Sequence, residues 1–160
     1  MKNSHPLVVF RLDEQRFAVA LPCVERIVRA VEVTPLPNAP GIVLGIIDVE
    51  GRVLPVLNLR RRLGLKEHRI HPGEQFIIAR AGGRAVVLVV DETQEVITPV
   101  ADDLVGAGTI APGLQHIDGA VSLPDGLVLI HDLEKFLSLE EARALDQAMS
   151  GKEEPALREN

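Results

Sequence analysis

Histidine side chains are the first residues of this chain to test for chemistry, because imidazole binds metals and titrates near neutral pH. His68 and His71 are three residues apart, a spacing that would place both rings on one face of a helix. Pro72 follows them directly, and neither a cysteine nor an acidic cluster joins them in the sequence. The pattern therefore favours ordinary histidines in an exposed linker, and we expect no metal and no other cofactor.

Nucleophiles and phosphate-binding loops are scarce as well. Cys23 is the only cysteine, and no nucleophile motif surrounds it, which favours a small, partly buried residue over a reactive thiol. Gly106-Ala107-Gly108 with Ala111 resembles the start of a dinucleotide-binding loop, but Pro112 and Gly113 prevent a long helix from starting there. We therefore expect no catalytic residues, and a protein that binds rather than an enzyme.

Three consecutive arginines, Arg60, Arg61 and Arg62, form the clearest charged feature of the sequence. Lys66 and Arg69 extend this basic stretch in a chain whose formal net charge is −6. One interpretation is a patch that docks an acidic partner, and the other is an ordinary solvated helix face. The sequence leaves both interpretations open.

The composition limits the classes of partner and compartment. Four Phe and no Trp or Tyr offer few platforms for stacked bases, and a net charge of −6 repels phosphate, so we expect no nucleic acid. A single cysteine suits a reducing compartment. The polar N-terminus and the lack of an apolar run of about 18 residues predict a cytoplasmic protein that does not insert into the membrane.

Short apolar runs separated by turn residues dominate the sequence and predict strands. Hairpins are expected around Asp13-Glu14-Gln15, Glu50-Gly51 and Gly82-Gly83, because these are turn-forming residues between apolar runs. The strands expected beside these turns are 7–12, 16–21, 42–49, 52–57, 75–81 and 84–90.

Three helical segments are expected. Residues 23–28 fit one or two helical turns, because three of their apolar side chains share one face at helical spacing. A short helix is expected after the capping residue Asn58. Ser138 and Glu141 fit the capping box of a C-terminal helix, and the charged residues 150–160 are expected to form a flexible tail.

The order of these elements recurs along the chain: hairpin, turn region, extended piece, loop, strand and helix. We interpret the recurrence as two similar subdomains, approximately 13–70 and 75–137, within one domain at 7–149. The strand at 7–12 could belong to either. The alternative is a coincidental likeness between valine-rich strands. Short strands with Gly and Pro turns predict a sandwich or barrel and argue against a doubly wound α/β fold.

From about Leu7 to Leu137 the chain resembles the CheW-like family of chemotaxis coupling proteins, and the order and spacing of many turns make the resemblance specific. The residues that carry it include Phe17-Ala18-Val19-Ala20-Leu21, Val24-Glu25-Arg26-Ile27, Val33-Thr34-Pro35-Leu36-Pro37, Leu44-Gly45-Ile46-Ile47, Gly51-Arg52-Val53-Leu54-Pro55-Val56-Leu57-Asn58-Leu59-Arg60 and Ile130-His131-Asp132-Leu133.

The resemblance implies a mainly all-β fold of two similar five-stranded β-barrels, with short connecting helices and a C-terminal helix. It implies a non-enzymatic adaptor whose partners are the cytoplasmic tip of a methyl-accepting chemoreceptor and the regulatory domain of a chemotaxis histidine kinase. Such an adaptor is recruited to receptor arrays at the membrane. The receptor groove would lie between the barrels, at positions that match Val24, Ile27 and Val96.

Two positions depart together from the family pattern. The family commonly has an acidic residue where this chain has Arg26, and Asn-Leu-Arg-Gly where this chain has Asp48-Val49-Glu50-Gly51. One hypothesis is that Arg26 and Glu50 form a charge-swapped pair near the receptor groove, where it would affect the choice of partner. The alternative is independent drift at two exposed sites.

Two other functions remain open at this point. The chain could be a CheW-like paralogue in a non-flagellar pathway, such as one for surface motility. It could instead be a small-ligand sensor, although the sequence offers no convergent cluster of polar groups for a ligand pocket.

Overall fold

The computed structural model describes residues 5–106 and 117–158 of the chain. The segment that resembled a dinucleotide-binding loop lies outside these residues, apart from Gly106. Within the described residues, no helix is both long enough and apolar enough to cross a lipid bilayer.

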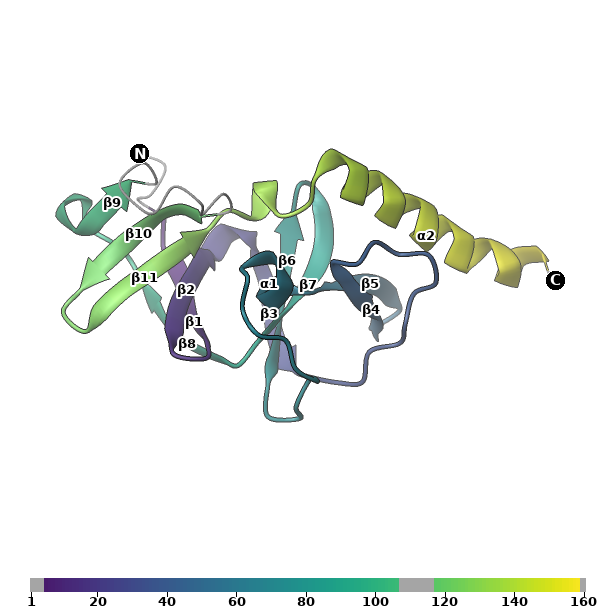
Figure 1. The fold of residues 1–160 in the computed structure, drawn as a ribbon, viewed down its shortest axis with the longest axis horizontal. Helices are drawn as coiled ribbons and strands as arrows, with labels where there is room; N and C mark the ends of the chain where they lie inside the picture. Colours follow the sequence, from purple (N-terminus) through teal and green to yellow (C-terminus); the bar gives the residue numbers. More distant parts are fainter. Residues whose placement is uncertain (1–4, 107–116, 159–160) are drawn as a thin grey trace.

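Two β-sheets form the molecule, with a long helix at the C-terminal end (Figure 1). The predicted fold class, mainly β with short helices and a C-terminal helix, is confirmed. One sheet has six strands, in the spatial order β8 (Glu92–Ile97), β1 (Leu7–Leu12), β2 (Gln15–Ala20), β11 (Gly126–His131), β10 (Ile117–Leu123) and β9 (Leu104–Gly106). The other has five, in the order β3 (Val24–Arg29), β6 (Gln75–Ala81), β7 (Arg84–Val90), β5 (Arg52–Leu57) and β4 (Val43–Val49).

The strands are divided between the sheets differently from the predicted halves. The hairpin β1–β2 belongs to the six-stranded sheet, where β2 pairs in parallel with β11 from the end of the chain. The hairpin β6–β7, which the repeat placed in the second half, belongs to the five-stranded sheet, where β7 pairs in parallel with β5. The boundaries 13–70 and 75–137 therefore do not coincide with the two sheets. Which sheet a strand belongs to is decided by its pairing with strands far away in the sequence. A pattern of residues along the chain does not predict that pairing.

The predicted hairpin turns are confirmed. Glu50 and Gly51 join β4 to β5, with φ angles of 52° and 88°. Gly82 and Gly83 join β6 to β7 with φ angles of 59° and 84°. Two successive positive φ angles match the twist of a hairpin, which explains the glycines. At the β1–β2 turn the loop is two residues, and Asp13 has a φ angle of 56°.

The expected helical turns at 23–28 are wrong. A single 3-10 turn, η1 (Leu21–Cys23), precedes the edge strand β3, which pairs with β6. Two features favour the strand: β-branched residues are common in this segment, and β6 offers an unpaired edge. The tertiary pairing outweighs the helical spacing of three apolar residues.

The remaining helices are short except for the last. They are α1 (Leu59–Arg62), η2 (Ala101–Asp103), η4 (Leu133–Lys135) and α2 (Leu139–Arg158). Asn58 caps α1 as predicted, because its side chain accepts a hydrogen bond from the Arg61 N–H at 3.1 Å. The capping box is also confirmed, with Glu141 accepting from the Ser138 N–H at 2.9 Å and donating its own N–H to the Ser138 hydroxyl at 3.0 Å. The tail expected at 150–160 is not separate, since α2 continues to Arg158.

The core joins the two sheets. The cluster shared by both contains Phe10 and Phe17 from the six-stranded sheet and Ile77 and Leu88 from the five-stranded sheet, together with Phe136 after η4. Each sheet also has a smaller core of its own. The molecule is thus held together by continuous burial of apolar surface across the junction of the sheets.

A close backbone approach at the start of β4 provides a test of this packing. A Cβ on Gly45 would lie 2.2 Å from the Thr34 carbonyl oxygen, which accepts the Ile46 N–H at 2.7 Å. Gly45→Ala should therefore lower the free energy of unfolding by about 2–3 kcal/mol in urea denaturation. Gly73→Ala is the control, since open space surrounds that position; its effect should stay within about 0.5 kcal/mol. Equal effects of the two substitutions would contradict the packing.

Candidate functional site

The predicted groove residues Val24, Arg26 and Ile27 lie on the edge strand β3. The pairing of β3 with β6 shifts register between Val24 and Arg26, so a bulge interrupts the regular alternation of side chains. Val24 is half-buried against the core shared by the sheets, whereas Ile27 is 39% exposed. After the bulge the pairing is regular, with Arg26 opposite Ile78 and Ile27 opposite Ile77, so these two exposed side chains lie on opposite faces of β3.

The predicted contact between Arg26 and Glu50 is confirmed. Arg26 Nη1 lies 3.1 Å from Glu50 Oε1, and both side chains are exposed. Glu50 is held in place by the β4–β5 turn, where Asp48 Oδ1 accepts the Gly51 N–H at 2.8 Å. The pair thus connects β3, at one edge of the five-stranded sheet, to the turn between β4 and β5.

A second group of ion pairs lies beside the first. Glu25 is 3.0 Å from Arg52 on β5 and 3.5 Å from Arg80 on β6. The hydrogen bond from Arg52 holds the pKa of Glu25 below its usual value, with a smaller contribution from Arg80. Glu25 and Arg26 of β3 are therefore both held in ion pairs, with partners on β5, on β6 and in the β4–β5 turn.

A depression runs between β3 and the start of β8. Ile27 and Arg29 line one side of it, and Glu92 and Thr93 line the other. The two sheets are joined there by Gln75 on β6, whose side-chain oxygen accepts the Thr93 N–H at 2.6 Å and the Thr93 hydroxyl at 2.9 Å. The predicted position between two β units is thus a real surface hollow, built from both sheets.

Val96 is not part of the wall of this depression. It lies on β8 opposite Val8 of β1, and it is 57% exposed. The structure therefore places Val24, Arg26 and Ile27 on β3 and brings Glu50 to Arg26, whereas Val96 lies on the other sheet. The role of these five residues in receptor binding stays a prediction.

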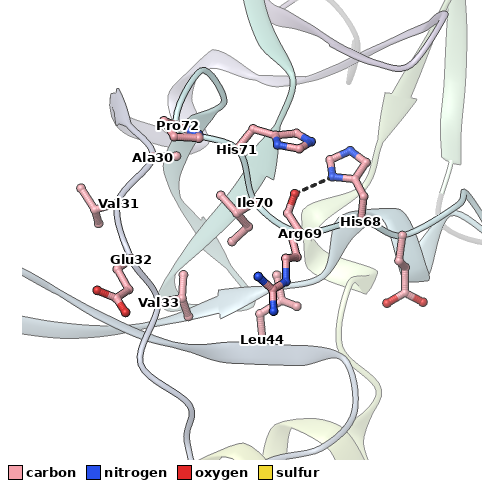
Figure 2. Close-up of a pocket in the computed structure, with 11 residues that line it drawn as sticks. Ala30, Val31, Glu32, Val33, Leu44, His68, Arg69, Ile70, His71 and Pro72 are labelled. Atoms are coloured by element: carbon pink, nitrogen blue, oxygen red, sulfur yellow. Dashed lines mark hydrogen bonds between the residues drawn. The ribbon is translucent and has the colours of Figure 1, made fainter.

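The surface has a second hollow that was not predicted from the sequence. Figure 2 shows it between the segment after β3 and the loop that precedes β6. Its wall contains the apolar side chains of Val31, Val33, Leu44 and Ile70. Val31 is 54% exposed and Leu44 is 38% exposed. These residues come from three separate segments, so no local pattern predicts that they share a surface.

The three arginines do not form a docking patch, which corrects one of the two interpretations of that stretch. Arg60 is only 7% exposed. Arg61 is half-exposed but is 3.2 Å from Glu67, and Arg62 contacts both oxygens of Glu141 at 2.6 Å. The helix α1 has a buried side, so consecutive arginines point in different directions. Each guanidinium is already paired with a carboxylate of the same chain.

Arg60 is at the centre of a buried ionic cluster. It lies 2.6 Å from Asp91 Oδ1 and 2.9 Å from Asp13 Oδ1, and it donates to the Lys66 carbonyl at 3.0 Å. Burial opposes the ionisation of Asp91, but the Asp13 N–H and the Arg60 guanidinium outweigh burial and hold the pKa of Asp91 below its usual value. The cluster connects α1, the β1–β2 turn and the crossover between the two sheets.

Glu74 and His68 adjoin this cluster. Glu74 is 6% exposed, its Oε1 accepts the His71 N–H at 2.7 Å, and its Oε2 is 3.8 Å from His68 Nε2. Burial raises the pKa of Glu74; the His71 N–H opposes the shift and the nearby Asp91 adds to it. The sequence contained a signal for this contact. Glu74 and Asp91 directly flank the hairpin β6–β7, so they must meet at its open end.

Cys23 has the properties predicted for it. It is partly buried at the end of η1. Burial raises the pKa of its thiol, and the carboxylates of Glu134 and Asp132 raise it further. A thiol with a raised pKa stays protonated at neutral pH and is a poor nucleophile.

Comparisons with known proteins agree with the architecture. Residues 6–141 match the family model described as the CheW-like domain. The chain is 29% identical over 144 residues to "Chemotaxis protein CheW" of Rhizobium meliloti, a match that covers 89% of this chain and 93% of that protein. It is 35% identical over 96 residues to "Protein FrzA" of Myxococcus xanthus, covering 59% of this chain and 60% of the relative.

A solved structure has the same fold. The scaffolding protein TtCheW from Thermoanaerobacter tengcongensis superposes with a TM-score of 0.77. The sequences are 24% identical, and the match covers 86% of this chain and 95% of the other.

The ionic cluster predicts that the three arginines differ in their contribution to stability. Arg60→Met should lower the free energy of unfolding by about 3 kcal/mol, because it leaves the buried Asp91 without its main cationic partner. Arg61→Met is the matched control, and its effect should be small because Arg61 and Glu67 are both solvent-accessible. Urea denaturation at neutral pH measures both. Equal losses would mean that Arg60 does not organise the cluster.

Proposed function

Because the chain belongs to the CheW-like domain family, we propose that it is a non-enzymatic adaptor that couples chemoreceptors to a chemotaxis histidine kinase. In this proposal it binds the cytoplasmic tip of a methyl-accepting receptor and the regulatory domain of the kinase. It acts in the cytoplasm and is recruited to receptor arrays at the membrane. The signal passes through binding surfaces and not through a reaction.

The main observation in support of the proposed receptor site is the exposed edge of β3. Ile27 is 39% exposed and lines the depression that reaches β8, with Arg29 on the same side and Glu92 on the opposite side. An apolar side chain with charged neighbours suits the stripe of a helical hairpin, which presents apolar residues flanked by polar ones. Val24 would support this surface from beneath, and Val96, which is 57% exposed, would extend it onto the six-stranded sheet.

The pathway served by the adaptor stays open between two candidates. The curated relatives include proteins named for chemotaxis and one named FrzA, at 35% identity over 96 residues. A paralogue acting in a non-flagellar pathway is therefore the second candidate. The genes adjacent to the one that encodes this chain would distinguish them, since adjacent genes for flagellar chemotaxis proteins would favour the first.

A charge at Ile27 should abolish receptor capture, because the aspartate would lose water at an apolar contact. The measurement is a pull-down of Ile27→Asp with the cytoplasmic hairpin of a receptor and, separately, with the kinase regulatory domain. Binding to the kinase domain should be unchanged. Leu127→Asp is the matched control, since Leu127 is 50% exposed on β11 of the other sheet. Normal receptor capture by a folded Ile27→Asp protein would refute the site.

The ion pair should affect receptor affinity more than stability. Arg26→Glu and Glu50→Arg should each change the free energy of unfolding by less than about 1 kcal/mol, because both side chains are exposed. Each should change the dissociation constant for a receptor hairpin, and the double substitution should recover part of the change because it restores an opposite-charge pair. Titration calorimetry of all four proteins measures this. Four equal dissociation constants would leave the pair with no role in recognition.

A further inference from the structure

Three potential metal ligands converge at the open end of the β6–β7 hairpin. Gln75 pairs with Val90, so Glu74 and Asp91 lie next to one another just beyond the last pair of the hairpin. His68 approaches from the loop before β6. One ligand atom from each of His68, Glu74 and Asp91 lies within 4.8 Å of the others.

A backbone contact indicates which ring nitrogen of His68 is the hydrogen-bond donor. His68 Nδ1 lies 2.7 Å from the Arg69 carbonyl oxygen, as Figure 2 shows. A carbonyl oxygen can only accept, so Nδ1 carries the proton and donates it. The other ring nitrogen, Nε2, lies 3.8 Å from Glu74 Oε2. A second hydrogen bond that fixes the tautomer in this way is the usual arrangement around a metal-binding histidine.

A cation that contacts both carboxylates would reduce the repulsion between them. Glu74 is 6% exposed and lies beside Asp91 at the open end of the hairpin. Two ionised carboxylates at this separation repel each other unless a proton or a metal ion lies between them. Arg60 and Arg11 already pair with Asp91, whereas in the described part of the chain the only basic side chain within 4 Å of a Glu74 carboxylate oxygen is that of His68.

The distances suit a small transition-metal ion. Ligand atoms about 2.0–2.2 Å from a tetrahedral zinc ion are about 3.3–3.6 Å apart. The 3.8 Å between His68 Nε2 and Glu74 Oε2 needs only a slight closure of the loop. Two contacts already orient the carboxylates: the His71 N–H donates to Glu74 at 2.7 Å, and Arg60 holds Asp91 at 2.6 Å.

We propose that His68, Glu74 and Asp91 form a binding site for one divalent transition-metal ion, with zinc the best fit and the remaining coordination position open to water. One nitrogen and two carboxylate oxygens are ligands that zinc accepts. The ion would tie the loop before β6 to the crossover between the sheets. Glu74 and Asp91 also line the depression that contains Ile27, so the ion would stiffen one wall of it.

Zinc titration of the metal-stripped, full-length protein tests the proposal by calorimetry. The expected result is one zinc ion per chain with a dissociation constant in the micromolar range or below. Glu74→Gln, which conserves size, and His68→Ala should each weaken binding at least tenfold, with circular dichroism to confirm folding. The matched controls are His5→Ala and Cys23→Ser, which remove other zinc-binding groups and should leave the dissociation constant unchanged.

Cobalt(II) absorption of the wild-type protein provides a readout that needs no variant. The site predicts visible bands of a low-coordinate ion with nitrogen and oxygen ligands, and no thiolate charge-transfer band. Three results would overturn the proposal. The first is no zinc binding at a zinc concentration of about 100 times a micromolar dissociation constant. The others are unchanged zinc binding in folded Glu74→Gln and His68→Ala proteins, and a cobalt spectrum that shows the thiolate of Cys23. In the first case a shared proton, rather than a metal ion, stabilises the two carboxylates.

Discussion

The buried guanidinium of Arg60 is the interaction on which the arrangement of the two sheets depends. Arg60 belongs to the helix that follows β5 of the five-stranded sheet, and it reaches Asp13 in the β1–β2 turn of the six-stranded sheet. It also holds Asp91, at the point where the chain crosses from one sheet to the other. Removing these charges from water is costly, and only a complete set of partners offsets the cost. The apolar core holds the sheets together, and this cluster adds charged contacts between them.

The surface that follows from this arrangement is the exposed edge of β3 and the depression beside it. An exposed strand edge can pair with foreign strands, and charged side chains such as Arg26 and Arg29 make that pairing unfavourable. Arg29 and Glu92, which line the depression with Ile27, give this apolar contact point a charged border. In the proposed adaptor, shape and apolar contact supply affinity for a receptor hairpin, and the reversed pair Arg26–Glu50 restricts which hairpin is accepted.

Local chemistry in the sequence predicted the turns and the caps. A few neighbouring residues determine the positive φ angles at Gly51 and Gly83. The same is true of the reciprocal hydrogen bonds between Ser138 and Glu141, so both features can be predicted from the sequence. The division of strands between sheets was not predictable in this way, since β2 pairs with β11 more than 100 residues later. Three consecutive arginines suggested a basic surface, but the orientation of α1 buries Arg60. The pattern of strands and turns alone predicted a sandwich or barrel, whereas the family resemblance supplied the candidate groove and the pair Arg26–Glu50.

Methyl NMR of the chain during titration with a receptor cytoplasmic hairpin tests the central claim most directly, because it reports each apolar side chain without altering it. The account predicts that the largest shifts occur at Val24, Ile27 and Val96, while Leu127 on β11 and Leu139 at the start of α2 stay unchanged. Largest shifts at Leu127 or Leu139, or shifts nowhere at saturating hairpin, would contradict the claim that the edge of β3 binds the receptor.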